Sequence, residues 1–162
     1  MSDVVDLYET DFVRWSEEQA SALRTAGLSG ANLPLDWEHL AEEIDSLGKS
    51  LRSELRNRLA TIVEHLLKLH LSPAVDPRAG WLETIERERV EIEALLDENP
   101  SLRGAISDSL QSADRKARKL AALSLKAHGE WSSGKQRGLI ELRFSEADVV
   151  GPGFPASSSV PL

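Results

Sequence analysis

The sequence predicts an all-α protein, a single-domain bundle of about five helices. Apolar residues recur at three- and four-residue steps through most of residues 8–123, the spacing that gathers them on one face of a helix. Clusters of Gly, Pro, Ser and Asn interrupt these runs where helices would begin and end. The length of 162 residues fits one domain with its own core.

The first expected helix runs from Asp6 to Ala26. The periodicity predicts one buried face made of Tyr8, Phe12, Trp15, Gln19, Ala22, Leu23 and Ala26. Gly27 is a natural stop, because glycine adopts the conformation that ends helices without strain. Residues 28–35 are rich in turn formers and read as a connection. Asp36 can then cap the next helix by accepting its free amide hydrogens.

The centre of the predicted core is an antiparallel helical hairpin. Its first helix carries an apolar stripe formed by Trp37, Leu40, Ala41, Ile44 and Leu47. Gly48 followed by Lys49-Ser50 favours a stop and a new start, so that the second helix covers residues 51–71. A single continuous helix weakened by Gly48 is the alternative.

Two further helices are expected at residues 79–97 and 101–128, separated by Asn99-Pro100. Small residues at Ala113 and Ala117 would let a neighbouring helix approach closely. Residues 1–128 therefore form the predicted bundle domain. Residues 129–162 are rich in Gly, Pro and Ser and predict an irregular C-terminal tail, in which the alternation of Leu139 to Phe144 favours a short extended segment.

Composition narrows the classes of function. The absence of cysteine from the sequence excludes disulfides, thiolate metal sites and cysteine nucleophiles. The acidic start lacks the features of a secretory signal and charges interrupt every apolar run, so we expect a cytoplasmic protein without membrane spans. A net charge of -8 disfavours nucleic acid as a partner. Residues 101–128 differ, with six Lys or Arg against two Asp.

A polar seam is expected beside the apolar stripes of the hairpin. Glu43 and His65 would lie on adjacent helices of the hairpin, with His39 one turn before Glu43. Their hydrogen-bond partner would be Arg52, Arg56 or Arg58. Carboxylate and imidazole can bind a divalent metal. The Glu-x-x-His step that di-iron bundles use twice occurs here only once and reversed, at His39 and Glu42. We therefore expect a structural seam, with neither metal nor other cofactor.

A basic helix at residues 113–126 supplies the candidate contacts to a partner, which are Arg115, Lys116, Arg118 and Lys119, together with Trp131 beyond its end. Helical spacing spreads these cations around the helix, whereas a phosphate-binding helix would collect them on one face. A basic helix on an acidic chain either docks on that chain or recruits an acidic partner.

Several segments resemble a known bacterial family, the domain of unknown function 29. They are Leu7 to Trp15, Leu40 to Ser50, Glu64 to Lys68, Trp81 to Arg89 and Asn99 to Arg103, in that order and spacing. The resemblance covers about residues 6–125 and ends beyond His128. It implies a small all-helical bacterial protein of unassigned activity and supplies no catalytic residues.

The leading prediction for function is a non-enzymatic protein–protein interaction module that forms a homodimer or binds an unidentified protein partner. Bundles of this size with a long amphipathic helix often self-associate. One alternative is a metal- or small-ligand-dependent enzyme that uses Glu43 and His65. Another is an accessory protein that binds nucleic acid through the basic helix.

Overall fold

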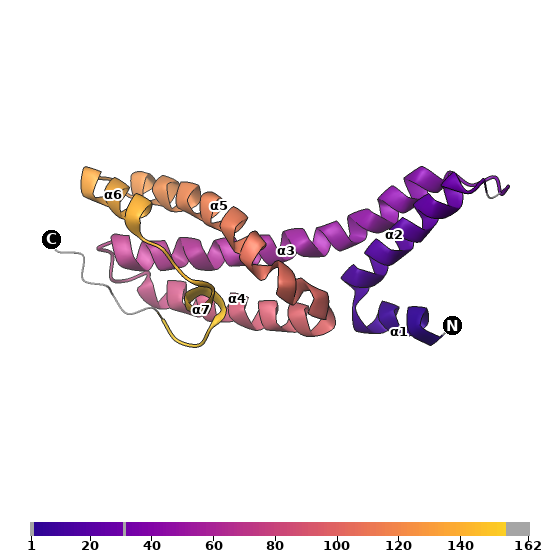
Figure 1. The fold of residues 1–162 in the computed structure, drawn as a ribbon. Coiled ribbons are helices and arrows are strands. Elements are labelled where there is room, and N and C mark those ends of the chain that lie inside the picture. The colour runs from indigo at the N-terminus through magenta and orange to yellow at the C-terminus, as the bar shows by residue number, and fades with distance from the viewer. Residues whose placement is uncertain (1, 31, 155–162) are drawn as a thin grey trace. The chain divides into compact units, whose positions relative to one another are not determined.

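The computed structural model describes residues 2–30 and 32–154, and no strand occurs among them. In chain order its elements are α1 (Ser2–Thr10), α2 (Phe12–Leu28), α3 (Trp37–Leu71), α4 (Arg78–Glu98), the 3-10 helix η1 (Pro100–Ala105), α5 (Ile106–Ala127), α6 (Ser133–Glu141) and α7 (Glu146–Val150) (Figure 1). The all-α class is therefore confirmed. In this part of the chain, no helix combines the length and the apolar character that crossing a membrane requires.

The elements fall into two compact units, and α3 and α4 each contribute to both. Unit 1 comprises Met1–Glu54 and Ala94–Ala105, and unit 2 comprises Leu55–Glu93 and Ile106–Leu162.

α3 is one continuous helix of 35 residues, so the predicted break at Gly48 and the hairpin between residues 37–48 and 51–71 were wrong. Gly48 is buried, and a Cβ atom there would overlap the hydroxyl oxygen of Ser16 in α2. Glycine inside a helix costs about 1 kcal/mol relative to alanine. The close approach of α2 explains its presence, so this glycine marks a helix contact and not a helix end.

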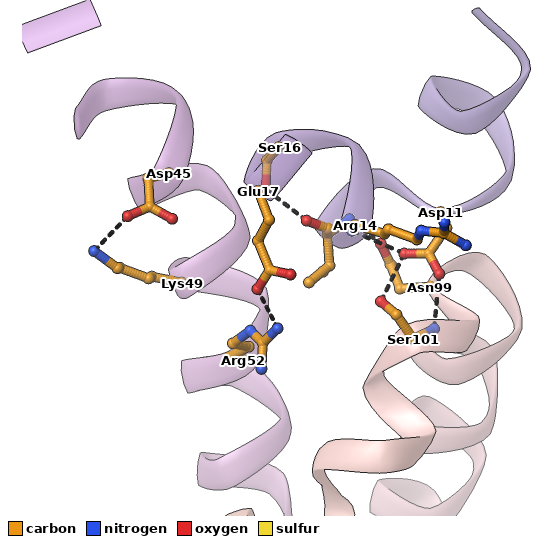
Figure 2. A network of polar contacts seen from close by, with 10 residues as sticks. Asp11, Arg14, Ser16, Glu17, Asp45, Lys49, Arg52, Asn99 and Ser101 are labelled. Carbon is orange, nitrogen blue, oxygen red and sulfur yellow. Dashed lines mark hydrogen bonds and ion pairs between the residues drawn. The ribbon is translucent and has the colours of Figure 1, made fainter. Parts of the chain in front are cut away.

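In unit 1, α2 runs antiparallel to the first half of α3. At one end Gly27 comes so near to Trp37 that a Cβ on the glycine would lie 2.8 Å from the Trp37 Cβ. Towards the other end the Glu17 carboxylate pairs with Arg52 (Figure 2). Fully buried side chains in this part of the unit are Val13, Ala20 and Ala41. An antiparallel helical hairpin is therefore present, but it is formed by α2 and the first half of α3.

Asp11 interrupts the helix that was predicted over residues 6–26. As the N-cap of α2, its Oδ1 accepts a hydrogen bond from the amide of Arg14 at 3.0 Å. Its carboxylate also accepts from the amide of Ser101 at 2.7 Å and from the Ser101 hydroxyl at 2.8 Å (Figure 2). The side-chain oxygen of Asn99 accepts from a backbone amide of α2 at 3.2 Å. Unit 1 therefore attaches η1 to the start of α2 through buried polar groups.

The core of unit 2 is built by the second half of α3 together with α4 and α5. Its fully buried side chains include Leu55, Leu59, Ile62, Leu66, Ile85 and Leu125. Ala113 and Ala117 are also fully buried, as expected for a stripe of small residues that a neighbouring helix approaches closely. The Nζ of Lys116 donates to the side-chain oxygen of Asn57 at 2.9 Å and so links α5 to α3.

The predicted irregular tail contains two helices within its described part, and the expected extended segment at Leu139 to Phe144 was wrong where α6 occupies it. Gly138 explains the position of α6, because a Cβ there would lie 2.5 Å from a methyl carbon of Leu71. A capping box begins α7: the hydroxyl and amide of Ser145 donate to Asp148 and lower the pKa of its carboxyl. Residues 155–162 of the predicted tail lie outside the described residues.

Arg89 of α4 holds the segment around α7. Its side chain is buried, and its guanidinium donates to the carbonyl oxygens of Asp148, Val149 and Gly153 at 2.8, 2.9 and 2.6 Å. The same group pairs with Glu86 at 2.8 Å and lies 5.3 Å from the centre of the Phe154 ring. One buried cation thus satisfies three carbonyls at and beyond the end of a short helix.

Part of the predicted core is exposed. Tyr8, Leu40 and Leu47 keep 49%, 40% and 49% of their surface accessible, although each lies on a stripe that was expected to be buried. All three belong to unit 1, where α2 covers a neighbouring face of α3.

Candidate partner-binding groove

The structure does not bring the predicted polar seam together. Glu43 and His65 both lie on α3, about six helical turns apart, because the expected hairpin between them does not form. Glu43 is exposed, and the Nδ1–H of His65 can donate to the carbonyl of Thr61 at 2.8 Å. Arg58 pairs with Glu88 at 3.0 Å. Among residues 2–30 and 32–154, no cluster of three His, Cys, Asp or Glu residues could hold a metal ion.

His39 makes a local pair at the start of α3. Its Nδ1 lies 2.5 Å from Oδ2 of Asp36, and both side chains are exposed. The hydrogen bond to Asp36 raises the pKa of His39, and the same bond lowers the pKa of Asp36. The pair caps a helix, since the Asp36 carboxylate also accepts from the amide of His39 at 3.3 Å.

Three of the five predicted partner contacts lie together in the structure. Arg118, Lys119 and Trp131 line one open groove of about 450 Å³ in unit 2. The remaining lining residues come from α5, α6 and the segment after α6, and they are Ala122, Gln136, Leu139, Ile140 and Arg143. Of the other two predicted contacts, Arg115 is exposed and Lys116 binds Asn57. Neither lines this groove.

Arg118 serves as a wall of the groove. Its guanidinium binds both oxygens of Asp114, at 2.7 and 2.8 Å, so its charge is compensated within α5. It also donates to the carbonyl oxygens of Leu139 and, at 2.7 Å, Leu142. The carbonyl of Leu139 belongs to the last turn of α6 and that of Leu142 to the residue after the helix, where carbonyls lack partners within the helix itself. Arg118 therefore fixes the helix that forms the other side of the groove.

The uncompensated charge of the groove belongs to Lys119 and Arg143. Both are exposed, and neither pairs with a carboxylate in the described part of the chain. The guanidinium of Arg143 caps the end of α6 by donating to the carbonyl of Leu142 at 2.8 Å. None of the eight lining residues is acidic. A ligand in the groove would meet positive potential that the lining itself does not cancel.

Apolar surface accompanies this charge. Ile140 is 62% exposed within the groove, and Trp131 presents a half-buried ring. The ammonium of Lys126 lies 4.7 Å from the centre of that ring, a cation–π contact that positions the indole. The arrangement can accept an anionic group together with an apolar side chain. It contains no pair of groups placed for acid–base or nucleophilic chemistry on a substrate.

A second cavity in unit 2 is smaller and of mixed charge. It measures about 250 Å³ and is lined by residues that include Lys68, Trp81, His128 and Glu130. The Lys68 ammonium lies 4.9 Å from the centre of the Trp81 ring and 3.7 Å from the Glu64 carboxylate, so it is already engaged. Ligand pockets usually exceed about 300 Å³. The groove between α5 and α6 is the better candidate.

Sequence reasoning missed the α6 side of the groove. Gln136, Leu139, Ile140 and Arg143 follow the steps of three, four and seven residues that mark one helical face. That signal was present, but the surrounding glycines and serines favoured an irregular tail.

Comparisons with known proteins give a family and a fold. The family model described as "Domain of unknown function DUF29" matches residues 7–132. The chain is similar to an alpha-helical protein of unknown function from Rhodospirillum rubrum, whose crystal structure it matches with a TM-score of 0.63 and 24% identity over 91% of this chain and 98% of the other. That similarity supports the fold alone. No curated protein matches the chain.

Proposed function

The chain belongs to the DUF29 family, and we propose that it acts as a non-enzymatic protein–protein interaction module whose α5–α6 groove binds an acidic segment of a partner protein. One observation carries the proposal. Lys119, Arg143 and Trp131 share an open groove that has exposed apolar surface and no acidic lining residue. An acidic segment with an apolar anchor side chain complements both features.

The two alternatives have weaker support. An enzyme based on Glu43 and His65 lacks the juxtaposition that its chemistry needs, since helix α3 keeps these residues apart. Nucleic acid would need several phosphate contacts along one face. The groove offers two uncompensated cations, Lys119 and Arg143, which suit a short acidic segment better.

The test measures binding of a fluorescent peptide that alternates glutamate with leucine. We expect Lys119→Glu combined with Arg143→Glu to weaken binding by at least about tenfold, because two attractive charges become repulsive. Trp131→Ala should weaken it through loss of the apolar wall. The control for each charge reversal taken singly is Arg137→Glu, which changes an exposed cation of α6 outside the groove lining.

The second arm of the test measures binding of double-stranded DNA and RNA that carry the same fluorescent label. If either nucleic acid binds tightly and its affinity falls steeply as the salt concentration rises, the partner is nucleic acid and not a protein. Equal peptide affinities for the wild type, the double variant and the Arg137 control would exclude the groove as the binding surface.

A further inference from the structure

A second surface, in unit 1, is apolar where the α5–α6 groove is basic. On α3 the residues Leu40, Ile44, Leu47 and Leu51 follow steps of four, three and four, the seam spacing of packed helices. Leu40 and Leu47 are 40% and 49% exposed, and Ile44 and Leu51 are half-buried. Single exposed leucines are ordinary, but here two exposed leucines and two half-buried apolar residues share one stripe.

Helix α2 carries a matching stripe of half-buried residues, made of Phe12, Trp15, Gln19, Leu23 and Ala26. The contact line between the helices passes through Ala20 and Ala41, both fully buried, and through the approach of Ser16 to Gly48. At about 100° per residue each stripe lies roughly a quarter turn from that line. Both stripes are rotated from the contact line in the same sense about their own helix axes. Because α2 and α3 are antiparallel, this places both stripes on the same side of the helix pair.

The opposite side of this helix pair is polar. Arg24 pairs with Asp45 at 3.5 Å, and Glu17 pairs with Arg52. Lys49 donates to Asp45 at 2.7 Å and lowers the pKa of that carboxyl (Figure 2). By the same helical geometry these groups fall away from both apolar stripes. The α2–α3 pair is therefore amphipathic, with one charged side and one side whose two stripes, from Leu40 to Leu51 and from Phe12 to Ala26, contain no charged residue.

We propose that the apolar α2–α3 face is the homodimer interface, on which two copies of the chain pack as a four-helix bundle. The face is one half of such a bundle, and a two-fold axis supplies the missing half from an identical helix pair. A charge-free face also selects a partner surface that is equally free of charge. A second copy presents that surface by definition.

The size of the face sets the expected strength of the dimer. From Phe12 to Ala26 it is about 21 Å long, and two helices make it about 20 Å wide, for a projected area of at most about 400 Å² per copy, because the ring of Tyr8 in α1 packs on Phe12 and Trp15 at one end. Two copies together contribute about 800 Å², which is below the standard range of about 1,200–2,000 Å² and falls among weak, transient interfaces. The dimer therefore depends on concentration, and its surface is separate from the α5–α6 groove of the proposed function.

Sedimentation equilibrium of the full chain tests the proposal over a wide concentration range. The wild type is expected to shift from monomer to dimer. Leu40→Glu combined with Leu47→Glu should raise the dimer dissociation constant by about a hundredfold or more, because four carboxylates would be buried in the interface. Ser21→Glu combined with Ser46→Glu adds the same charge on the polar side and should leave the dissociation constant unchanged.

Two further measurements keep the result interpretable. Both leucines are exposed, so the helical circular dichroism of the double variant should equal that of the wild type. Since the sequence contains no cysteine, Leu47→Cys can be cross-linked with a short bifunctional maleimide, and Ser21→Cys serves as the control. A wild type that stays monomeric at every concentration overturns the proposal. A dimer that persists in Leu40→Glu with Leu47→Glu, or that cross-links equally through both cysteines, also overturns it.

Discussion

The two halves of α3 carry the same apolar periodicity and differ in what covers it. In unit 2, Leu55, Leu59 and Ile62 are completely buried by α4 and α5. In unit 1, Leu40 and Leu47 repeat the same steps and remain 40% and 49% exposed. A periodic stripe thus predicts which side of a helix avoids water, but not whether other helices of the same chain bury that side. Where the chain leaves such a side exposed, another molecule has a place to bind.

The largest expected difference in stability is between two leucine-to-alanine variants, one in each half of α3. Leu59→Ala should lower the free energy of unfolding by about 2–5 kcal/mol, because it leaves a cavity in a closed core. Leu47→Ala should cost less than about 1 kcal/mol in dilute solution, where its surface is already wet. Urea unfolding of the two variants compares the midpoints. Equal losses of unfolding free energy would mean that Leu47, in the first half of α3, is as fully buried as Leu59 in the second half.

An intermediate effect is expected at Gly48. A methyl group there would overlap the hydroxyl oxygen of Ser16, and overpacking of this kind costs about 1–3 kcal/mol, partly offset by the better helix propensity of alanine. Adding Ser16→Ala removes the overlapping atom and should restore part of the loss in thermal unfolding. Gly80→Ala is the control, since nothing lies within 4 Å of its position, and it should not destabilise. Destabilisation that Ser16→Ala cannot relieve would argue against this contact.

The smallest effect concerns the exposed pair at the start of α3. The pKa of His39 is raised, so its contribution to stability is complete below the ordinary imidazole value and is lost as pH rises through the folded value. The pKa of Asp36 is lowered, so its contribution is complete above the ordinary carboxyl value and is lost as pH falls through the folded value. The pair therefore acts between about pH 4 and 6.5.

A nuclear magnetic resonance titration of the imidazole checks this assignment. The pKa of His39 should exceed the ordinary value of about 6.5, and Asp36→Asn should bring it down towards that value. An unchanged titration in Asp36→Asn would mean that the two side chains do not interact in solution.

Local signals explain which parts of the fold were predictable. Asn99-Pro100 and Gly129 separate helices by their own backbone preferences, and Gly129 has a φ of 69°, which favours glycine. The helix expected at residues 79–97 accordingly matches α4, at Arg78–Glu98. Gly48 and Asp11 misled the prediction because their roles depend on distant partners, Ser16 for one and Ser101 for the other.

The candidate groove was half predictable for a similar reason. Charge and position alone singled out Lys119 and Trp131, since both follow from the basic helix and its end. Arg143 became visible only with α6, whose packing depends on Gly138 next to Leu71. The polar seam failed as a site because Glu43 and His65 needed a chain reversal that α3 does not make.

The buried guanidinium of Arg89 constrains how this chain can be altered at its C-terminal side. Its three carbonyl acceptors lie between Asp148 and Gly153, so a version trimmed at residue 147 would retain a cation without the oxygens that now solvate it. Such a shortened protein would keep the Glu86 carboxylate as a partner of the guanidinium and lose all three carbonyls. Fusion partners and affinity tags are therefore better joined downstream of residue 154 than in place of the last helix.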